Sequence, residues 1–170
     1  MKNKRTFIRA GLTLFTILWM LFIFIMSGAE EDTSRAQSGA VCEIICQTFV
    51  EGYDQMSQDE QTALQARISF PVRKGAHLTE YAVLGALLAL TAASYEIRGL
   101  YGGRGYALLT GLLYAVSDEI HQIFVPGRAG QLRDVIIDTC GVIIGICLID
   151  GFGRFMKYYQ TSLKYSNEAE

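Results

Sequence analysis

Residues 10–29, AGLTLFTILWMLFIFIMSGA, decide the fold, because this stretch contains no charged side chain. A helix rises ~1.5 Å per residue, so the stretch is long enough to cross the ~30 Å hydrocarbon core of a bilayer. Basic residues precede it, and Ser27-Gly28-Ala29 resembles the cleavage site of a signal sequence. The apolar run exceeds the ~7–15 residues typical of a signal sequence. We therefore interpret residues 7–29 as a retained transmembrane helix, with a cleaved signal sequence as the alternative.

Three further apolar segments, residues 76–95, 105–125 and 134–155, predict membrane helices. Pro126-Gly127 ends the third helix of the chain, and the fourth carries Gly141 and Gly145 at a spacing that lets a neighbouring helix approach closely. The sequence thus predicts an all-α membrane protein with four transmembrane helices. We expect a single domain over residues 1–155, followed by a mobile cytoplasmic tail over residues 156–170.

The segment between the first two predicted helices is polar. Within it, apolar residues at helical spacing predict a short amphipathic helix over residues 37–50. Cys42 and Cys46 would lie one turn apart on this helix, with Cβ atoms ~6 Å apart. A disulfide needs ~3.5–4.5 Å, so we predict neither a disulfide nor a cysteine metal site.

The distribution of basic residues predicts the orientation. With the N-terminus and C-terminus in the cytoplasm, the inner segments hold nine of the fifteen basic residues: Lys2, Lys4, Arg5, Arg9, Arg98, Arg104, Arg154, Lys157 and Lys164. We therefore expect a multi-pass protein of the cell membrane with both ends inside. The net charge of −2 argues against a nucleic acid partner.

Ionisable residues of the predicted helices gather at one depth. Glu80 and Asp138 each lie four residues into their helices, ~6 Å below the outer end. Asp118 lies ~20 Å from the inner face of a ~30 Å core, so it reaches the same level. A charge inside a membrane helix costs ~2.5–3.5 kcal/mol, so such residues face a partner or a water-filled cavity. The pattern predicts an outward-facing polar pocket, and a purely structural cluster of salt bridges is the alternative.

The ionisable residues at this depth are candidates for general acid–base catalysis, because burial and neighbouring charges can tune their protonation. They are His77, Glu80, Asp118, Glu119, His121, Asp134 and Asp138. The sequence identifies no nucleophile, since Ser117 lacks the Gly-x-Ser-x-Gly turn of hydrolases. The candidate ligand-binding residues are Arg73, Lys74, Tyr81, Gln122 and Arg128. Arginine suits the bidentate capture of a phosphate or carboxylate, and anchoring at the membrane interface is the alternative.

The two histidines of the chain suggest a metal site as an alternative interpretation of the polar residues. His77 with Glu80 and Asp118 with His121 have the three-residue spacing that carboxylate-bundle metal proteins use. These four residues are the candidate ligands. The match to that pattern is partial, so we predict histidines that hydrogen-bond or transfer protons, and no cofactor.

Three segments carry a family resemblance: RKGAHLTEY at residues 73–81, SDEIHQIFVPGR at 117–128 and DVIIDTCG at 134–141. They resemble the signature blocks of the VanZ-like family, and residues 19–27 and 34–39 are similar to its first helix and the exit from it. The resemblance covers residues 5–150, and three blocks in order make it specific. It implies a bacterial four-helix membrane protein of the envelope. The name-giving member confers low-level resistance to the glycopeptide teicoplanin, but the resemblance supplies no catalytic role for these residues.

Three functions remain open at this stage. The first is binding or modulation of a lipid-linked cell-wall precursor or an amphiphilic glycopeptide antibiotic at the outer pocket, with membrane lipid as a further partner. The second is an intramembrane hydrolase or transferase that acts on an envelope lipid or peptide. The third is a small proton-coupled transporter, because buried carboxylates and histidines also serve as proton relays.

Overall fold

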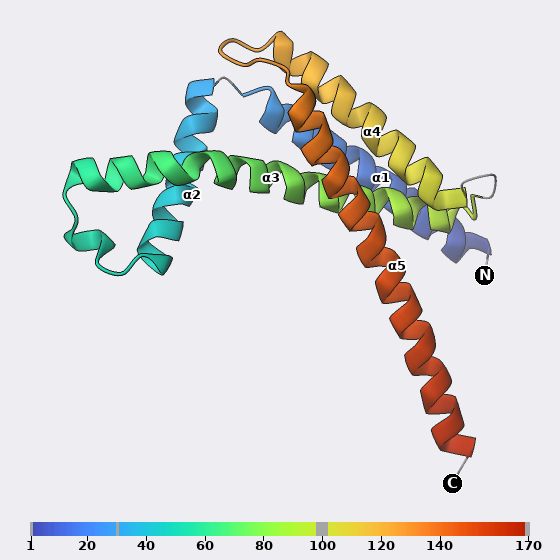
Figure 1. Cartoon of the computed structure of the whole chain (residues 1–170). Coiled ribbons are helices and arrows are strands. Elements are labelled where there is room, and N and C mark those ends of the chain that lie inside the picture. Colours follow the sequence, from blue (N-terminus) through green and yellow to red (C-terminus); the bar gives the residue numbers. More distant parts are fainter. Residues whose placement is uncertain (1, 30, 98–101, 169–170) are drawn as a thin grey trace.

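The computed structural model describes residues 2–29, 31–97 and 102–168, and Figure 1 shows their arrangement. Within these ranges the chain forms five α-helices and one 3₁₀ turn: α1 (Lys2–Ser27), α2 (Glu31–Phe49), η1 (Tyr53–Gln55), α3 (Gln58–Ser94), α4 (Gly102–Ile123) and α5 (Leu132–Glu168). The predicted all-α fold is confirmed. Arg98, which the sequence analysis assigns to an inner segment, lies outside the described residues.

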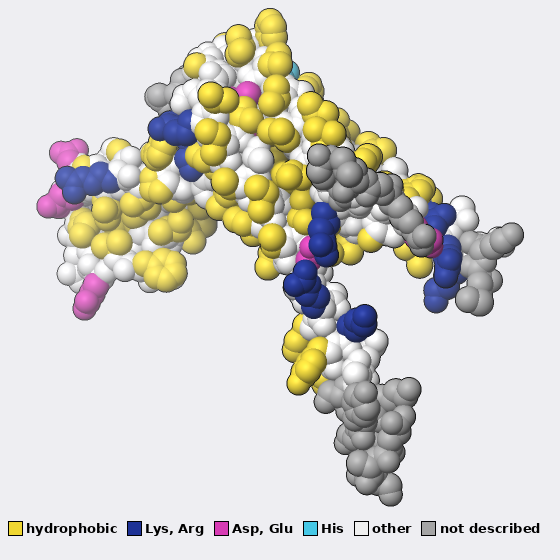
Figure 2. All heavy atoms as spheres, turned by 45° about the vertical axis from the view of Figure 1, so that its right-hand side comes forward, with side chains coloured by type: hydrophobic (Ala, Val, Ile, Leu, Met, Phe, Trp, Pro, Cys, Tyr) yellow, Lys and Arg dark blue, Asp and Glu magenta, His cyan; other side chains and the backbone are white. Residues whose placement is uncertain are grey.

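Three of the described helices, α1, α3 and α5, are long and apolar enough to cross a membrane. Helix α4 has 22 residues and is long enough, but its last turns carry Asp118, Glu119 and Gln122 and lower its hydropathy. The predicted count of four spans is therefore not confirmed. Figure 2 shows hydrophobic side chains over much of the surface, with Lys, Arg, Asp and Glu gathered mainly toward the extremities. Such a surface suits contact with lipid.

Helix α3 begins at Gln58, well before residue 76, where the sequence predicts the membrane-spanning part to start. A capping box starts it: the Ser57 side chain accepts a hydrogen bond from the Glu60 backbone N–H, and the Glu60 carboxylate accepts one from the Ser57 N–H at 2.9 Å. Pro71 lies inside the helix without ending it. Helix α3 is thus ~55 Å long, nearly twice the thickness of the hydrocarbon core.

Helix α2 crosses α3 within the first half of α3 and contacts it there (Figure 1). It contains the amphipathic helix predicted over residues 37–50, and it begins earlier, at Glu31. Cys42 and Cys46 are buried free thiols on this helix. The side of α2 that is buried is the one that carries the two cysteines, whereas Val41, Ile44 and Phe49 of the predicted apolar face are exposed.

Helix α5 continues through Glu168, beyond residue 155, where the sequence predicts the membrane-spanning part to end. Residues 152–161 are exposed, and in Figure 1 this part of α5 runs away from the other helices. Gly151 and Gly153 do not interrupt it. A glycine costs ~1 kcal/mol relative to alanine within a helix, which is too little to end a long one.

Glycines let α5 lie close against α3. A Cβ atom added to Gly141 would lie 3.0 Å from the Tyr81 Cβ, and one added to Gly145 would lie 2.7 Å from the Ala86 backbone nitrogen. The close approach predicted from the Gly141-x-x-x-Gly145 spacing is confirmed. On α4, a Cβ added to Gly111 would lie 2.7 Å from the Val142 side chain, so all three helices meet tightly just below the site.

Polar contacts define the two ends of the bundle. At one end the Arg9 Nε donates to the Ser94 carbonyl at 2.7 Å. At the other end the Ser27 hydroxyl donates to Asp118 at 2.5 Å. The second end holds the C-terminal ends of α1 and α4, the middle of α3 and the start of α5. It is the end that the sequence places outside.

Candidate functional site

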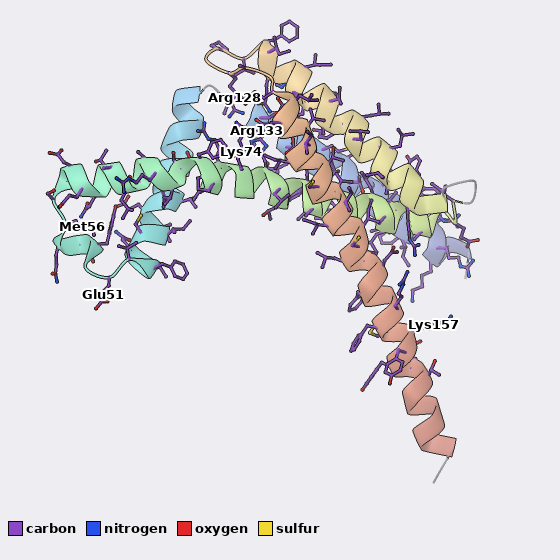
Figure 3. The ribbon with its side chains drawn as sticks, in the orientation of Figure 1. Glu51, Met56, Lys74, Arg128, Arg133 and Lys157 are labelled. Atoms are coloured by element: carbon purple, nitrogen blue, oxygen red, sulfur yellow. The ribbon has the colours of Figure 1, made fainter. Side chains whose placement is uncertain are left out.

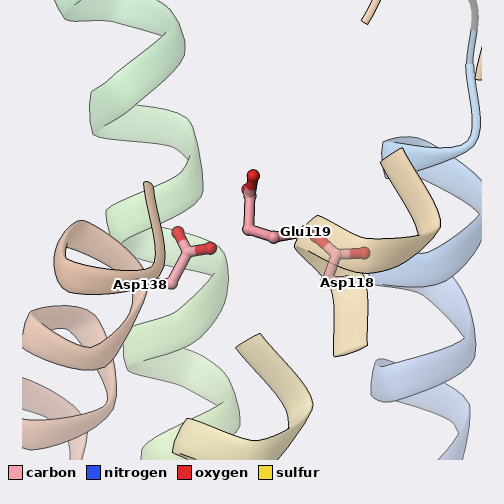
Figure 4. Close-up of side chains that lie close together, drawn as sticks. All are labelled: Asp118, Glu119 and Asp138. Carbon is pink, nitrogen blue, oxygen red and sulfur yellow. The ribbon is translucent and has the colours of Figure 1, made fainter. Parts of the chain in front are cut away.

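Three buried carboxylates meet at this end of the bundle. Asp118 and Glu119 come from the last turns of α4, and Asp138 comes from the second turn of α5. They each offer a carboxylate oxygen within 4.8 Å of the others, and Figure 4 shows the three side chains together between the two helices. We call Asp118, Glu119 and Asp138 the carboxylate cluster. Asp118 and Asp138, for which the sequence predicts one depth, thus lie together in the structure.

Asp118 is fixed by hydrogen bonds on both of its oxygens. The Ser27 hydroxyl of α1 donates to Oδ1 at 2.5 Å, and the Gln122 amide donates to Oδ2 at 3.1 Å. Sequence reasoning missed Ser27, because it was considered only as part of a cleavage site. The available signal was a hydroxyl at the end of an apolar helix, at the same level as the predicted pocket.

Glu119 is held by the loop that joins α4 to α5. Its Oε2 accepts a hydrogen bond from the Gln131 backbone N–H at 2.7 Å, while its buried Oε1 has no hydrogen-bond partner. Gly130 packs against the same residue: a Cβ there would lie 2.7 Å from the Glu119 carbonyl oxygen. The carboxylate thus has one oxygen fixed and one oxygen available.

Asp138 is fully buried, and neither of its oxygens has a hydrogen-bond partner among the described residues. The His77 Nδ1 lies 3.8 Å from its Oδ1, beyond hydrogen-bond distance. Tyr81, also fully buried, has a hydroxyl without a hydrogen-bond partner. Leaving such groups unpaired is costly, so these atoms are the most unusual feature of the site.

A second layer of charges lies above the carboxylate cluster. The Lys74 Nζ lies 2.5 Å from Asp134 Oδ2, and the Arg133 Nε lies 4.0 Å from Asp134 Oδ1. Figure 3 shows Lys74, Arg128 and Arg133 near one another where α3 meets the loop between α4 and α5.

A cavity of about 260 Å³ lies at this layer of charges. Its lining residues are Phe70, Arg73, Lys74, His77, Gln122, Gly127, Arg128, Ala129, Gln131, Arg133 and Asp134. We call it the polar cavity.

A larger cavity of about 600 Å³ opens between α1, α2 and α3, and its lining is mostly apolar. Its lining residues are Trp19, Phe22, Met26, Ser27, Ser38, Val41, Ile45, Val72, Arg73, Gly75, Ala76, His77, Thr79, Glu80, Val83 and Arg128. We call it the apolar cavity. Arg73, His77 and Arg128 line both cavities, so the two meet at a basic boundary.

The structure separates some residues that the sequence placed together. Glu80 lines the apolar cavity, and its carbonyl accepts a hydrogen bond from the Trp19 indole at 2.9 Å. His121 turns toward α1, where its ring stacks on Phe24 at 4.1 Å. The four candidate metal ligands weighed from the sequence therefore do not form one group. In the part of the chain that the structure describes, the group with ligand spacing is the carboxylate cluster.

The hydrolase interpretation gains no support from Ser117. Its side chain is exposed, and its hydroxyl donates to the Tyr114 carbonyl of the same helix at 2.7 Å. The hydroxyl thus makes a local helix contact, as serines commonly do.

Comparison with known proteins gives one match. Neither the curated proteins nor the solved structures include one that matches this chain. A family model described as VanZ/LLP1 matches residues 12–153, which include the cluster, both cavities and the glycine contacts beneath them. Because this match covers most of the chain and agrees with the three segments singled out from the sequence, the protein belongs to the VanZ/LLP1 family.

Proposed function

We propose that this protein binds an amphiphilic molecule of the bacterial envelope, with the apolar part in the apolar cavity and the anionic part at the basic boundary. The ligand would be a lipid-linked cell-wall precursor or an acylated glycopeptide of the teicoplanin type, and binding would modulate the action of that antibiotic. The observation that supports this proposal is that the two cavities share three lining residues, Arg73, His77 and Arg128.

The chemistry of the two cavities fits the two parts of such a ligand. Lipid tails are as apolar as leucine, so a hydrocarbon chain gains little when it leaves the bilayer for the apolar cavity. Selectivity must then come from the polar end. An arginine binds a phosphate or carboxylate through two parallel hydrogen bonds, and Arg73 keeps a buried Nε without a hydrogen-bond partner beside the boundary.

Host protection tests the polar end of this proposal. Arg73→Gln should abolish protection of a bacterial host against an acylated glycopeptide, while membrane yield and thermal stability stay near wild type. Arg67→Gln is the matched control, because Arg67 is exposed on the same helix and lines neither cavity. Equal protection by both variants would contradict a role for the basic boundary.

Glu80→Gln tests the apolar cavity in the same assay, because it removes a charge from the cavity lining and keeps its shape. We expect normal yield and lost protection. The dependence on the acyl chain is tested with a glycopeptide of the same core that lacks this chain, against which the wild-type protein should give little protection. Equal protection against both antibiotics would show that the apolar cavity is not the binding site.

A further inference from the structure

Two basic side chains of α3 lie near the carboxylate cluster without pairing closely with it. On α3, Lys74 is engaged by Asp134, and His77 stays 3.8 Å from Asp138. From α1, the described residues contribute the Ser27 hydroxyl, which donates to Asp118. Two unit charges 4 Å apart repel by ~4 kcal/mol at an effective dielectric constant of 20. Three carboxylates at this spacing therefore require protons or a bound cation.

The hydrogen bonds around the cluster leave oxygen atoms available on the inner side. Asp118 and Glu119 are oriented from outside by Ser27, Gln122 and the Gln131 N–H. Glu119 Oε1 and both oxygens of the fully buried Asp138 have no partner, although all are shielded from solvent. Ligating carboxylates are commonly held in this way, with outer groups fixing their orientation and inner oxygens facing the ion.

Tyr81 gives a second, independent indication. It belongs to α3 and not to the acidic residues of α4 and α5, it is fully buried, and its hydroxyl has no hydrogen-bond partner. Asp118 and Asp138 both interact electrostatically with this hydroxyl, and Asp118 lies near hydrogen-bond distance of it. A neutral oxygen from a third helix thus faces the same buried volume as the carboxylates.

We propose that Asp118, Glu119 and Asp138 bind one hard divalent cation, with the Tyr81 hydroxyl as a further oxygen beside it. Carboxylate oxygens without sulfur or imidazole select ions such as Ca²⁺, Mg²⁺ and Mn²⁺. Calcium bonds to oxygen at ~2.3–2.6 Å, so oxygens on opposite sides of the ion lie ~4.6–5.2 Å apart. The three carboxylates each offer an oxygen within 4.8 Å of the others, so one ion can contact all three.

The polar cavity gives the ion a route from the end of the bundle. Gln122 lines that cavity and also bonds Asp118, and His77 lines it and approaches Asp138. A bound ion would tie α4 to α5 beneath the basic boundary. The cation site does not depend on the proposed ligand, because the ligand pocket is formed mainly by α1, α2 and α3.

Manganese binding to the full chain tests the cation site. The protein is placed in phosphatidylcholine nanodiscs and treated with a chelator before Mn²⁺ is added. Paramagnetic resonance separates free from bound Mn²⁺, and we expect saturable binding of one ion per chain, displaced by Ca²⁺. Glu119→Gln and Asp138→Asn should each weaken binding more than about tenfold, since even loss of an outer support costs that much. Asp150→Asn is the matched control, because Asp150 pairs with Arg104 at the other end of the bundle.

The thermal unfolding midpoint of the wild-type protein, measured with and without Ca²⁺, tests the site even if a variant fails to fold. Ca²⁺ added to the chelated protein should raise the unfolding midpoint, because an ion that binds only the folded state stabilises it. The proposal is overturned if the wild-type chain binds no Mn²⁺ saturably, or if folded Glu119→Gln and Asp138→Asn bind it like Asp150→Asn. Either result leaves the protection assay for Arg73 and Glu80 unaffected, so the two proposals fail separately.

Discussion

Ser27 is the residue that connects α1 to the carboxylate cluster. Its hydroxyl is buried and donates to Asp118, which is itself 2% exposed. Ser27→Ala leaves that oxygen of Asp118 without its donor, and an unsatisfied buried acceptor costs ~1–3 kcal/mol. We therefore expect the free energy of unfolding in detergent micelles to fall by about that amount.

Ser117→Ala is the matched control for Ser27→Ala, because the Ser117 hydroxyl is exposed and bonds only within its own helix. Its unfolding free energy should stay within ~0.5 kcal/mol of wild type. A similar loss in both variants would indicate that the contact between Ser27 and Asp118 does not stabilise the fold.

The sequence predicted the depth of the site residues better than their direction. Depth follows from counting residues along a helix, and Asp118 and Asp138, predicted at one level, do lie together in the structure. Direction depends on how each helix is rotated against its neighbours. For this reason the structure turns His121 toward Phe24 and Glu80 toward the apolar cavity, while Glu119 joins the cluster.

At the scale of the elements, the approach of α5 to α3 depends on glycines. Gly141→Leu should lower the thermal unfolding midpoint in detergent, because even its Cβ would lie 3.0 Å from the Tyr81 Cβ and 2.5 Å from the Leu78 carbonyl oxygen. Overpacking of this kind costs ~1–3 kcal/mol or more. The rest of the leucine side chain has no space unless the helices separate.

Gly151→Leu on the same helix provides the comparison for Gly141→Leu, since a Cβ at Gly151 would meet nothing within 4 Å. Its midpoint should stay near that of the wild type. If the midpoint of Gly141→Leu is also unchanged, with normal expression, α5 does not pack on α3 through this face.

The boundaries of the elements were the weakest part of the sequence prediction. Hydropathy identified the apolar parts of α3 and α5, but helices do not end where their hydropathy falls. The capping box at Ser57 starts α3 in a polar region, and α5 continues beyond the apolar segment to Glu168. Both extensions are polar stretches that keep helical hydrogen bonds outside the region predicted to lie in the membrane.

At the scale of the whole molecule, the two ends of the bundle differ in their charges. The end near the N-terminus pairs Arg5 with Glu96 at 3.5 Å and Arg104 with Asp150 at 2.5 Å, on exposed or half-buried side chains. The opposite end holds the buried carboxylates. Basic residues close to membrane helices favour the cytoplasmic side. Both ends carry basic residues, among them Arg73, Arg128 and Arg133 beside the carboxylate cluster, so the orientation that places this cluster outside stays a prediction from the sequence.

Thiol labelling in intact cells tests this orientation on a chain whose native cysteines have been replaced. Cysteines at Ser57 and Ala129 should react with an impermeant reagent, because both positions are exposed and belong to the end of the bundle, or its extension, predicted to face outward. Cysteines at Asn3 and Gln160 are also exposed, but they should react only after the membrane is permeabilised. Because all four positions are exposed in the folded chain, a difference in labelling reports the side of the membrane and not burial. Labelling of Asn3 and Gln160 but not of Ser57 and Ala129 would reverse the orientation and turn both cavities toward the cytoplasm, where an antibiotic arriving from outside could not reach them directly.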